Sequence, residues 1–151
     1  MAVSQLNAFL RRHAHIALDT SVFIYQLEAN PRYAAFTDQI FSWLESPRHH
    51  AVTSTITMME LLVQPYRHSD ERVDEFYALL STFPNLDWIP PSLKIADAAA
   101  RIRAVHRLQT ADALQAATAL DSGASGFVTN DVVFERVENF ETLLLERLVA
   151  S

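Results

Sequence analysis

Residues 16–21 read Ile16-Ala17-Leu18-Asp19-Thr20-Ser21, an apolar run that ends in a carboxylate and two hydroxyls. From His15 to Leu18 the run is short and apolar and leads into a polar turn, which is typical of a buried parallel strand. A carboxylate beside buried sequence is costly unless a partner neutralises its charge. The stretch therefore predicts a central strand with a functional group at its carboxyl end.

Three other segments also set one acidic residue among apolar or small neighbours. They are Met58-Met59-Glu60-Leu61-Leu62, Thr110-Ala111-Asp112-Ala113-Leu114 and Phe127-Val128-Thr129-Asn130-Asp131. Clustered carboxylates repel one another until a cation binds between them, and oxygen ligands suit hard cations such as Mg2+ and Mn2+. Asp19, Glu60, Asp112 and Asp131 are therefore candidate ligands of one metal site.

The composition is that of a globular protein rather than a membrane or secreted one. The 151 residues are 50% hydrophobic and 20% charged, which fits a single domain spanning residues 1–151. No apolar run approaches the roughly 20 residues of a membrane span, and Met1 to His15 lacks the apolar core of a secretory signal. The absence of cysteine excludes disulfides, thiolate zinc sites and cysteine nucleophiles. We expect a cytoplasmic protein with no membrane contact.

The net charge of −6 argues against nucleic-acid binding by bulk electrostatics. Any contact with a nucleic acid must therefore be local or be made through bound metal. Three small basic clusters are candidates for such a contact, although charged residues usually form a solvated face. They are Arg11-Arg12-His13, Arg48-His49-His50 and Arg101/Arg103/His106/Arg107.

Strand and helix patterns alternate along the chain, which argues for a parallel sheet covered on both faces. The expected strands are His15–Leu18, Ala51–Thr53, Leu86–Ile89 and Phe127–Thr129. The expected helices are Ser21–Glu28, Tyr33–Leu44, Ser54–Val63, Asp70–Thr82, Ser92–His106 and Thr110–Asp121. We predict an α/β fold, a three-layer α/β/α sandwich with a central, mostly parallel sheet.

The two ends of the chain are less regular. Val3, Leu6, Phe9 and Leu10 have the spacing of a short amphipathic helix, so residues 1–14 are expected to form an N-terminal helical extension. Periodicity does not decide whether Phe140–Leu145 is a fifth strand or a last helix.

Two of the four acids follow predicted strands. Asp19 and Asp131 come just after His15–Leu18 and Phe127–Thr129. In open parallel sheets, ligands bind outside the carboxyl ends of the strands, where the strand order reverses. These two carboxylates are therefore expected at one edge of the sheet.

The other two acids are expected on helices. Glu60 has Ile56 and Val63 at i−4 and i+3, so it shares a helix face with apolar residues and is not expected to be an ordinary surface charge. Asp112 lies in the first turn of its helix, with Thr110 as the expected cap.

Each acid also has a structural interpretation. The helix dipole alone favours Asp112 at a helix start, Asp19 could cap the following helix, Asp131 could be a turn residue, and Glu60 could pair with an arginine. The functional interpretation rests on the four together, because their placements agree with one edge of the sheet. Metal held there could activate water for phosphodiester cleavage.

At these residues the chain resembles PIN-domain ribonucleases, most closely the VapC-type toxins of bacterial toxin–antitoxin pairs. The resemblance runs from about Ile16 to Leu145, and its segments are specific as an ordered set rather than singly. They are Leu18-Asp19-Thr20-Ser21-Val22-Phe23-Ile24-Tyr25, Glu60-Leu61, residues 110–120 and Phe127-Val128-Thr129-Asn130-Asp131.

The resemblance implies Mg2+- or Mn2+-dependent cleavage of RNA. Asp19, Glu60, Asp112 and Asp131 would then be the catalytic and metal-binding residues, directly or through water. Three polar residues beside them would support the site, namely Thr20, Ser21 and Thr129. Such toxins usually form homodimers and are silenced by an antitoxin whose C-terminal segment wraps the toxin.

The chain departs from the family pattern at one site position. Many relatives carry another aspartate shortly after the one that matches Asp131, whereas here Val132, Val133 and Phe134 follow and the next acid is Glu135. The number of metal ions, one or two, is therefore open.

Two alternatives within the PIN-like interpretation also stay open. One is a solitary PIN nuclease in RNA processing, and the other is a catalytically weak interaction module.

Two phosphotransfer folds fit the sequence less well. A haloacid-dehalogenase-like phosphatase would need an aspartate where Ser21 stands. A response-regulator receiver would need a lysine after a late strand, but the only lysine, Lys94, follows the third.

Overall fold

The computed structural model describes residues 2–149. Its centre is a five-stranded sheet with the strand order β3-β2-β1-β4-β5, in which every neighbouring pair is parallel. The strands are β1 (His15–Leu18), β2 (His50–Ser54), β3 (Leu86–Ile89), β4 (Gly126–Thr129) and β5 (Glu141–Leu144). The predicted α/β class and parallel sheet are confirmed.

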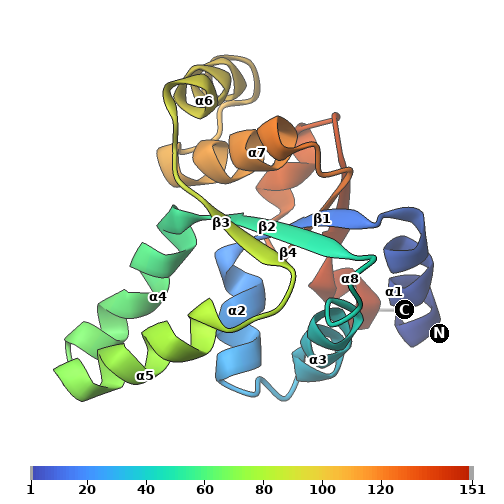
Figure 1. The fold of residues 1–151 in the computed structure, drawn as a ribbon. Coiled ribbons are helices and arrows are strands. Elements are labelled where there is room, and N and C mark those ends of the chain that lie inside the picture. Colours follow the sequence, from blue (N-terminus) through green and yellow to red (C-terminus); the bar gives the residue numbers. More distant parts are fainter. Residues whose placement is uncertain (1, 150–151) are drawn as a thin grey trace.

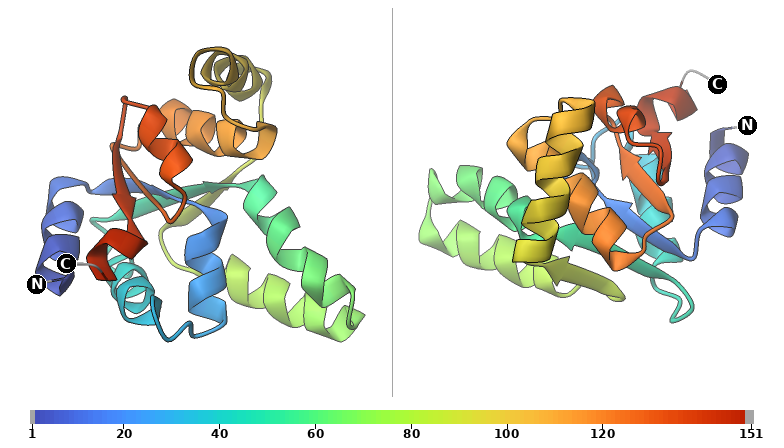
Figure 2. Two further views of the ribbon diagram at one scale, coloured as in Figure 1. Left: turned by 180° about the vertical axis from the view of Figure 1, so that it is seen from behind. Right: turned by 90° about the horizontal axis from the view of Figure 1, so that it is seen from above.

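Helices cover both faces of this sheet (Figure 1). One layer holds α6 (Leu93–His106), α7 (Thr110–Ser122) and the 3-10 helix η1 (Val132–Arg136). The other layer holds α1 (Ala2–Arg12), α2 (Thr20–Leu27), α3 (Ala34–Trp43), α4 (Thr55–Tyr66), α5 (Asp70–Ser81) and α8 (Leu145–Val149). Figure 2 shows α6 on the outer side of α7, away from the sheet.

The alternation of side chains along the central strands explains the two layers. In β1, Ile16 and Leu18 pack into the core beneath α2 and α3, whereas Ala17 packs toward α7. In β4, Val128 packs into the same core as Ile16 and Leu18, whereas Phe127 packs on the side of α7. Since both faces are covered, the strands are apolar throughout, as parallel strands buried on both sides require.

The N-terminal helix packs against the sheet through Gly126. The side chains of Leu6, Phe9 and Leu10 in α1 are buried. A Cβ atom at Gly126 would lie 2.7 Å from the Phe9 ring, so only glycine allows this close approach. The close contact explains one of the two glycines of the chain.

The structure corrects the predicted cap of α7. Its N-cap is Gln109, which has extended backbone angles, and Thr110 is the first helical residue. No side-chain hydrogen bond caps this helix. The predicted cap was wrong by one residue, because the last extended residue is Gln109 and the backbone is already helical at Thr110.

The C-terminal region resolves the choice left open by periodicity. Phe140–Leu145 contains β5, and the chain turns directly into α8 at Leu145. Within residues 2–149, no helix is long and apolar enough to cross a membrane.

Candidate functional site

The sheet reverses its order between β1 and β4. From β1 the chain continues to β2 on one side, whereas β4 and β5 lie on the other. The backbone N–H of Asp19 donates to the Val128 carbonyl at 3.0 Å, so the ends of the two strands are held together. As predicted, Asp19 and Asp131 follow these strand ends, at the position where open parallel sheets bind ligands.

Asp19 is both the N-cap of α2 and a largely buried carboxylate. Its Oδ1 accepts from the Thr20 N–H at 2.8 Å, and its Oδ2 accepts from the Thr129 hydroxyl at 2.7 Å. Burial raises the pKa of Asp19 from 3.8 to about 6, and the negative charges of Asp112 and Glu60 add to the rise against these hydrogen bonds. The carboxylate is thus held in place but is costly to ionise.

Glu60 reaches the site from α4 although it is exposed. The apolar face that it was predicted to share is only partly covered, because Ile56 is half-buried and Val63 is 42% exposed. The Thr20 hydroxyl donates to Glu60 Oε1 at 2.7 Å. Thr20 therefore bonds Asp19 through its backbone and Glu60 through its side chain.

Asp112 lies in the first turn of α7, on the other side of the sheet edge. Its pKa is raised by burial first and then by the negative charges of Asp131 and Glu60. Since Asp19 also responds to Asp112 and Glu60, the four carboxylates interact electrostatically. The structure thus brings together acids from four separate segments.

Asp131 is exposed and caps η1 by accepting from the Val133 N–H at 3.0 Å. Its own N–H donates to Thr129 Oγ1 at 3.1 Å, and this hydroxyl donates in turn to Asp19. Thr129 therefore links the two strand-end aspartates through one hydroxyl group.

A shallow hollow opens beside these two aspartates. It is lined by Asp19, Ser21, Tyr25, Asn130, Asp131 and Val132. The Ser21 Oγ atom is buried and has no hydrogen-bond partner among residues 2–149. Buried polar atoms normally have partners, so this hydroxyl is available to a water molecule or ligand next to Asp19.

A buried polar group that the sequence did not predict lies below the site. Gln115 of α7 donates to Thr57 Oγ1 at 2.7 Å, and Thr57 lies 2.8 Å from Thr53 Oγ1, which donates to the Leu18 carbonyl. Each hydroxyl has one proton, so Thr57 must donate to Thr53. The group joins α7, α4, β2 and β1 just below Asp19.

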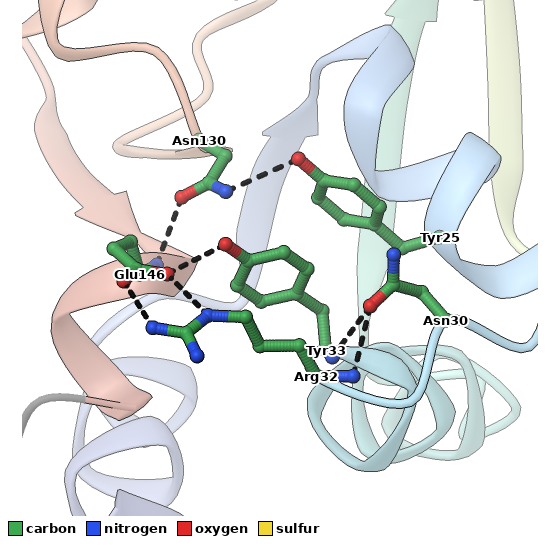
Figure 3. Close-up of polar contacts among 6 residues, drawn as sticks. All are labelled: Tyr25, Asn30, Arg32, Tyr33, Asn130 and Glu146. Atoms are coloured by element: carbon green, nitrogen blue, oxygen red, sulfur yellow. Dashed lines mark hydrogen bonds and ion pairs between the residues drawn. The ribbon is translucent and has the colours of Figure 1, made fainter.

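Asn130 was quoted in the strand-end motif but was not predicted to have a site role. Its Nδ2 donates to the Tyr25 hydroxyl at 3.1 Å, and its Oδ1 accepts from the Glu146 N–H at 2.8 Å (Figure 3). The residue thus connects the loop that carries Asp131 to α2 and α8. Its position between Thr129 and Asp131 was the only sequence signal for this bracing role.

Glu146 extends the same network toward the α2–α3 loop. Its carboxylate accepts from Arg32 Nε at 2.9 Å and from the Tyr33 hydroxyl at 2.5 Å (Figure 3). These hydrogen bonds lower the Glu146 pKa to about 2. The Asp131 loop is therefore tied to two helices and, through Glu146, to the α2–α3 loop.

The donor set can be compared with the needs of a divalent metal. Among residues 2–149, no three His, Cys, Asp or Glu side chains converge closely enough to enclose an ion. Mg2+, however, is commonly held through one or two carboxylates and several waters. The hard oxygens, the raised Asp19 pKa and the unpartnered Ser21 hydroxyl fit such a hydrated ion rather than a closed cage.

Comparison with known proteins identifies the family. A family model described as the PIN domain matches residues 16–139, whereas a sequence search of the curated proteins found no match. One similar solved structure is that of VapBC2 from Rickettsia felis bound to a DNA fragment from its promoter. The two sequences are 19% identical, and the match covers 86% of this chain and 98% of that chain with a TM-score of 0.66.

Two further complexes are similar to the same extent. FitAcB from Neisseria gonorrhoeae is 23% identical, and VapBC-1 from nontypeable Haemophilus influenzae is 21% identical. In both, the match covers 87% of this chain and 98% of the other, with a TM-score of 0.66. The TM-scores show a common fold, and the family model spans β1 through η1. The chain therefore belongs to the PIN-domain family, as its motifs predicted.

Proposed function

We propose that this protein is a metal-dependent endoribonuclease. PIN domains are nucleases, and four acids from separate segments interact at the edge of the sheet where parallel folds bind ligands. The observation that carries the proposal is the environment of Asp19, where burial and neighbouring negative charge raise the pKa of the carboxylate to about 6. A cation would relieve that cost.

Some residues of the chain would bind the metal, and others would position these ligands. Asp19, Glu60, Asp112 and Asp131 would hold Mg2+ or Mn2+, directly or through water. When bound, the metal would supply an activated water and stabilise negative charge on the phosphate. Thr20 and Thr129 orient the Asp19 carboxylate by hydrogen bonds to its two oxygens, so it is presented in a fixed geometry.

The acidic site also explains how a negatively charged protein could bind RNA. Bound metal reverses the local sign of the charge, so a phosphate can enter the pocket. Without metal, the same carboxylates would repel RNA. Substrate binding near the acids should therefore depend on the cation.

We further propose that the protein is the toxin of a type II toxin–antitoxin pair, of the VapC type, that it forms a homodimer, and that it acts in the cytoplasm. The support is the resemblance of the motifs and the similarity of the fold to the VapBC and FitAcB structures above and to a toxin–antitoxin complex from Klebsiella pneumoniae. A small adjoining gene that encodes a DNA-binding start and a basic tail would favour this proposal over a solitary nuclease in RNA processing.

Cleavage of a mixed RNA pool by purified, partner-free protein tests the function. Wild-type protein should cut RNA with Mn2+ or Mg2+ and should be inactive in EDTA. Asp19→Asn should lose cleavage while remaining folded, and Asp38→Asn, which makes the same change at an exposed position of α3, should not. Full activity of Asp19→Asn would refute the site. No cleavage by folded wild-type protein with either metal would favour the interaction module.

A further inference from the structure

The turn between α6 and α7 gathers three arginines. Arg103 lies in the last turn of α6, Arg107 is its C-cap, and Arg136 is the last residue of η1. Both elements pack on the same side of the sheet (Figure 2). In the described part of the chain, none of the three forms an ion pair with an acidic side chain.

The contacts of these arginines are with neutral groups. Arg136 Nη1 donates to the carbonyls of His106 at 3.2 Å and Arg107 at 3.4 Å, and Arg103 Nε donates to the Leu108 carbonyl at 3.2 Å. These bonds fix the two guanidinium groups around one helix end. Because carbonyl groups carry no net charge, these hydrogen bonds do not neutralise the positive charges of Arg103 and Arg136.

Arg107 differs from the other two because its side chain makes no hydrogen bond to residues 2–149. Its φ of 60° is in the left-handed region, where a helix C-cap usually favours glycine. With Arg103, it lines a shallow surface hollow that also includes Ala100, Ala104, Leu108 and Gln109. An unpaired arginine in a strained backbone position suggests a role outside folding.

Among residues 2–149, five of the other nine arginine and lysine side chains pair with acids, namely Arg12, Arg32, Lys94, Arg101 and Arg147, whereas Arg11, Arg48, Arg67 and Arg72 form no ion pair. Arg101 is on the same helix as Arg103 and pairs with Asp97. A group of three arginines without a carboxylate is thus a local positive area on a protein of net charge −6, and its natural ligand is an anion.

The position of the group connects it to the acidic site. Arg107 precedes Asp112 by five residues, so their Cα atoms are at most about 17 Å apart even for a fully extended chain. Arg136 ends the short helix that Asp131 caps, and Asp112 and Asp131 interact electrostatically. Arg107 and Arg136 therefore lie within five residues of Asp112 and Asp131 along the chain.

We propose that Arg103, Arg107 and Arg136 form a phosphate-binding subsite that holds the RNA backbone a few nucleotides from the bond that is cut. The inference rests on the proposed ribonuclease function. Arginine is suited to this role because its guanidinium group presents several donors to phosphate oxygens. The contact is with the backbone, so it contributes affinity without selecting a base sequence.

The test measures binding without cleavage. A 2′-O-methyl RNA oligonucleotide of mixed sequence is titrated with the full-length Asp19→Asn protein in Mg2+ at several salt concentrations, and a gel checks that the probe stays intact. Arg107→Gln and the double variant Arg103→Gln/Arg107→Gln are compared with Arg67→Gln. This control removes one exposed arginine at the C-cap of α4, which packs on the opposite face of the sheet from α6, α7 and η1.

Each subsite arginine removed should weaken binding several-fold, equally for different sequences, and lower the slope of log affinity against log salt by about 0.7. Arg67→Gln should change neither. Equal affinity and slope for Arg107→Gln, the double variant and the control would overturn the subsite, even if wild-type protein cuts the RNA pool. Weakened binding by the arginine variants would support the subsite even if wild-type protein fails to cut RNA, in which case only the proposed catalytic function fails.

Discussion

The replacement Asp19→Asn should stabilise the metal-free protein above neutral pH. The rise of the Asp19 pKa from 3.8 to about 6 corresponds to about 3 kcal/mol of unfavourable free energy for the ionised folded protein. Asparagine removes this charge, but its amide nitrogen cannot accept the hydrogen bond that Thr129 donates to Oδ2. That loss costs about 1 kcal/mol, so the net gain at pH 8 should be about 1–2 kcal/mol.

The sign of the pH dependence follows from proton binding. The folded pKa lies above the unfolded one, so the folded protein binds more protons between about pH 4 and pH 6. The contribution of Asp19 to stability is therefore present near pH 4 and is lost as the pH rises through 6. The advantage of Asp19→Asn should appear over the same window and should vanish, or reverse slightly, near pH 4.

Urea unfolding in EDTA at a series of pH values measures this difference, with Asp38→Asn as the matched control. Adding Mg2+ at pH 8 should stabilise wild-type protein, by about 2.7 kcal/mol when the cation is at 100 times its dissociation constant. Asp19→Asn should gain much less. A difference between wild type and Asp19→Asn that is independent of pH, together with equal Mg2+ effects, would refute the electrostatic reasoning.

Four other substitutions test the surroundings of the site. Asn130→Ala removes the links from the Asp131 loop to α2 and α8 and should lower the RNA cleavage rate about tenfold. Tyr25→Phe removes only the link to α2 and should have a smaller effect. Cleavage at the wild-type rate by both variants would show that these links are dispensable. Thr129→Val removes the hydrogen bond that the Thr129 hydroxyl donates to Asp19, so it should raise the Asp19 pKa further. The pH at which Mg2+ binding is half-maximal should then move upward in calorimetric titrations. An unchanged midpoint would contradict the role of this hydroxyl. Arg107→Gly relieves a left-handed backbone and should raise stability by about 1 kcal/mol while weakening RNA binding, whereas a destabilised variant would show that the side chain serves folding.

The strand ends could be predicted because a local pattern determines them. An apolar run that stops at a carboxylate, as at Leu18 and Asp19, marks both a buried strand and its functional edge. The same signal located Asp131 after β4. The meeting of these ends followed from the general behaviour of parallel α/β folds, whereas the strand order was not predicted.

Features that depend on distant partners could not be predicted. Gln115, Thr57 and Thr53 satisfy one another across three separate elements, and no spacing in the sequence indicates such a group. The partial exposure of the α4 face around Glu60 could not be predicted for a related reason, since an apolar neighbour such as Val63 is buried only if another element covers it. The N-cap at Gln109 depends on backbone angles that Thr110 does not reveal.

The central claim is that acids from separate segments act as one metal-dependent nuclease site, and a double-mutant cycle tests it most directly. Single-turnover RNA cleavage in Mn2+ is measured for wild type, Asp19→Asn, Asp112→Asn and the double variant. Each single substitution should reduce the rate by about 100-fold or more, and the double variant should lose little beyond either one, because residues that act as a unit are not additive. Wild-type rates in either single variant, or losses that multiply in the double variant, would contradict a shared site.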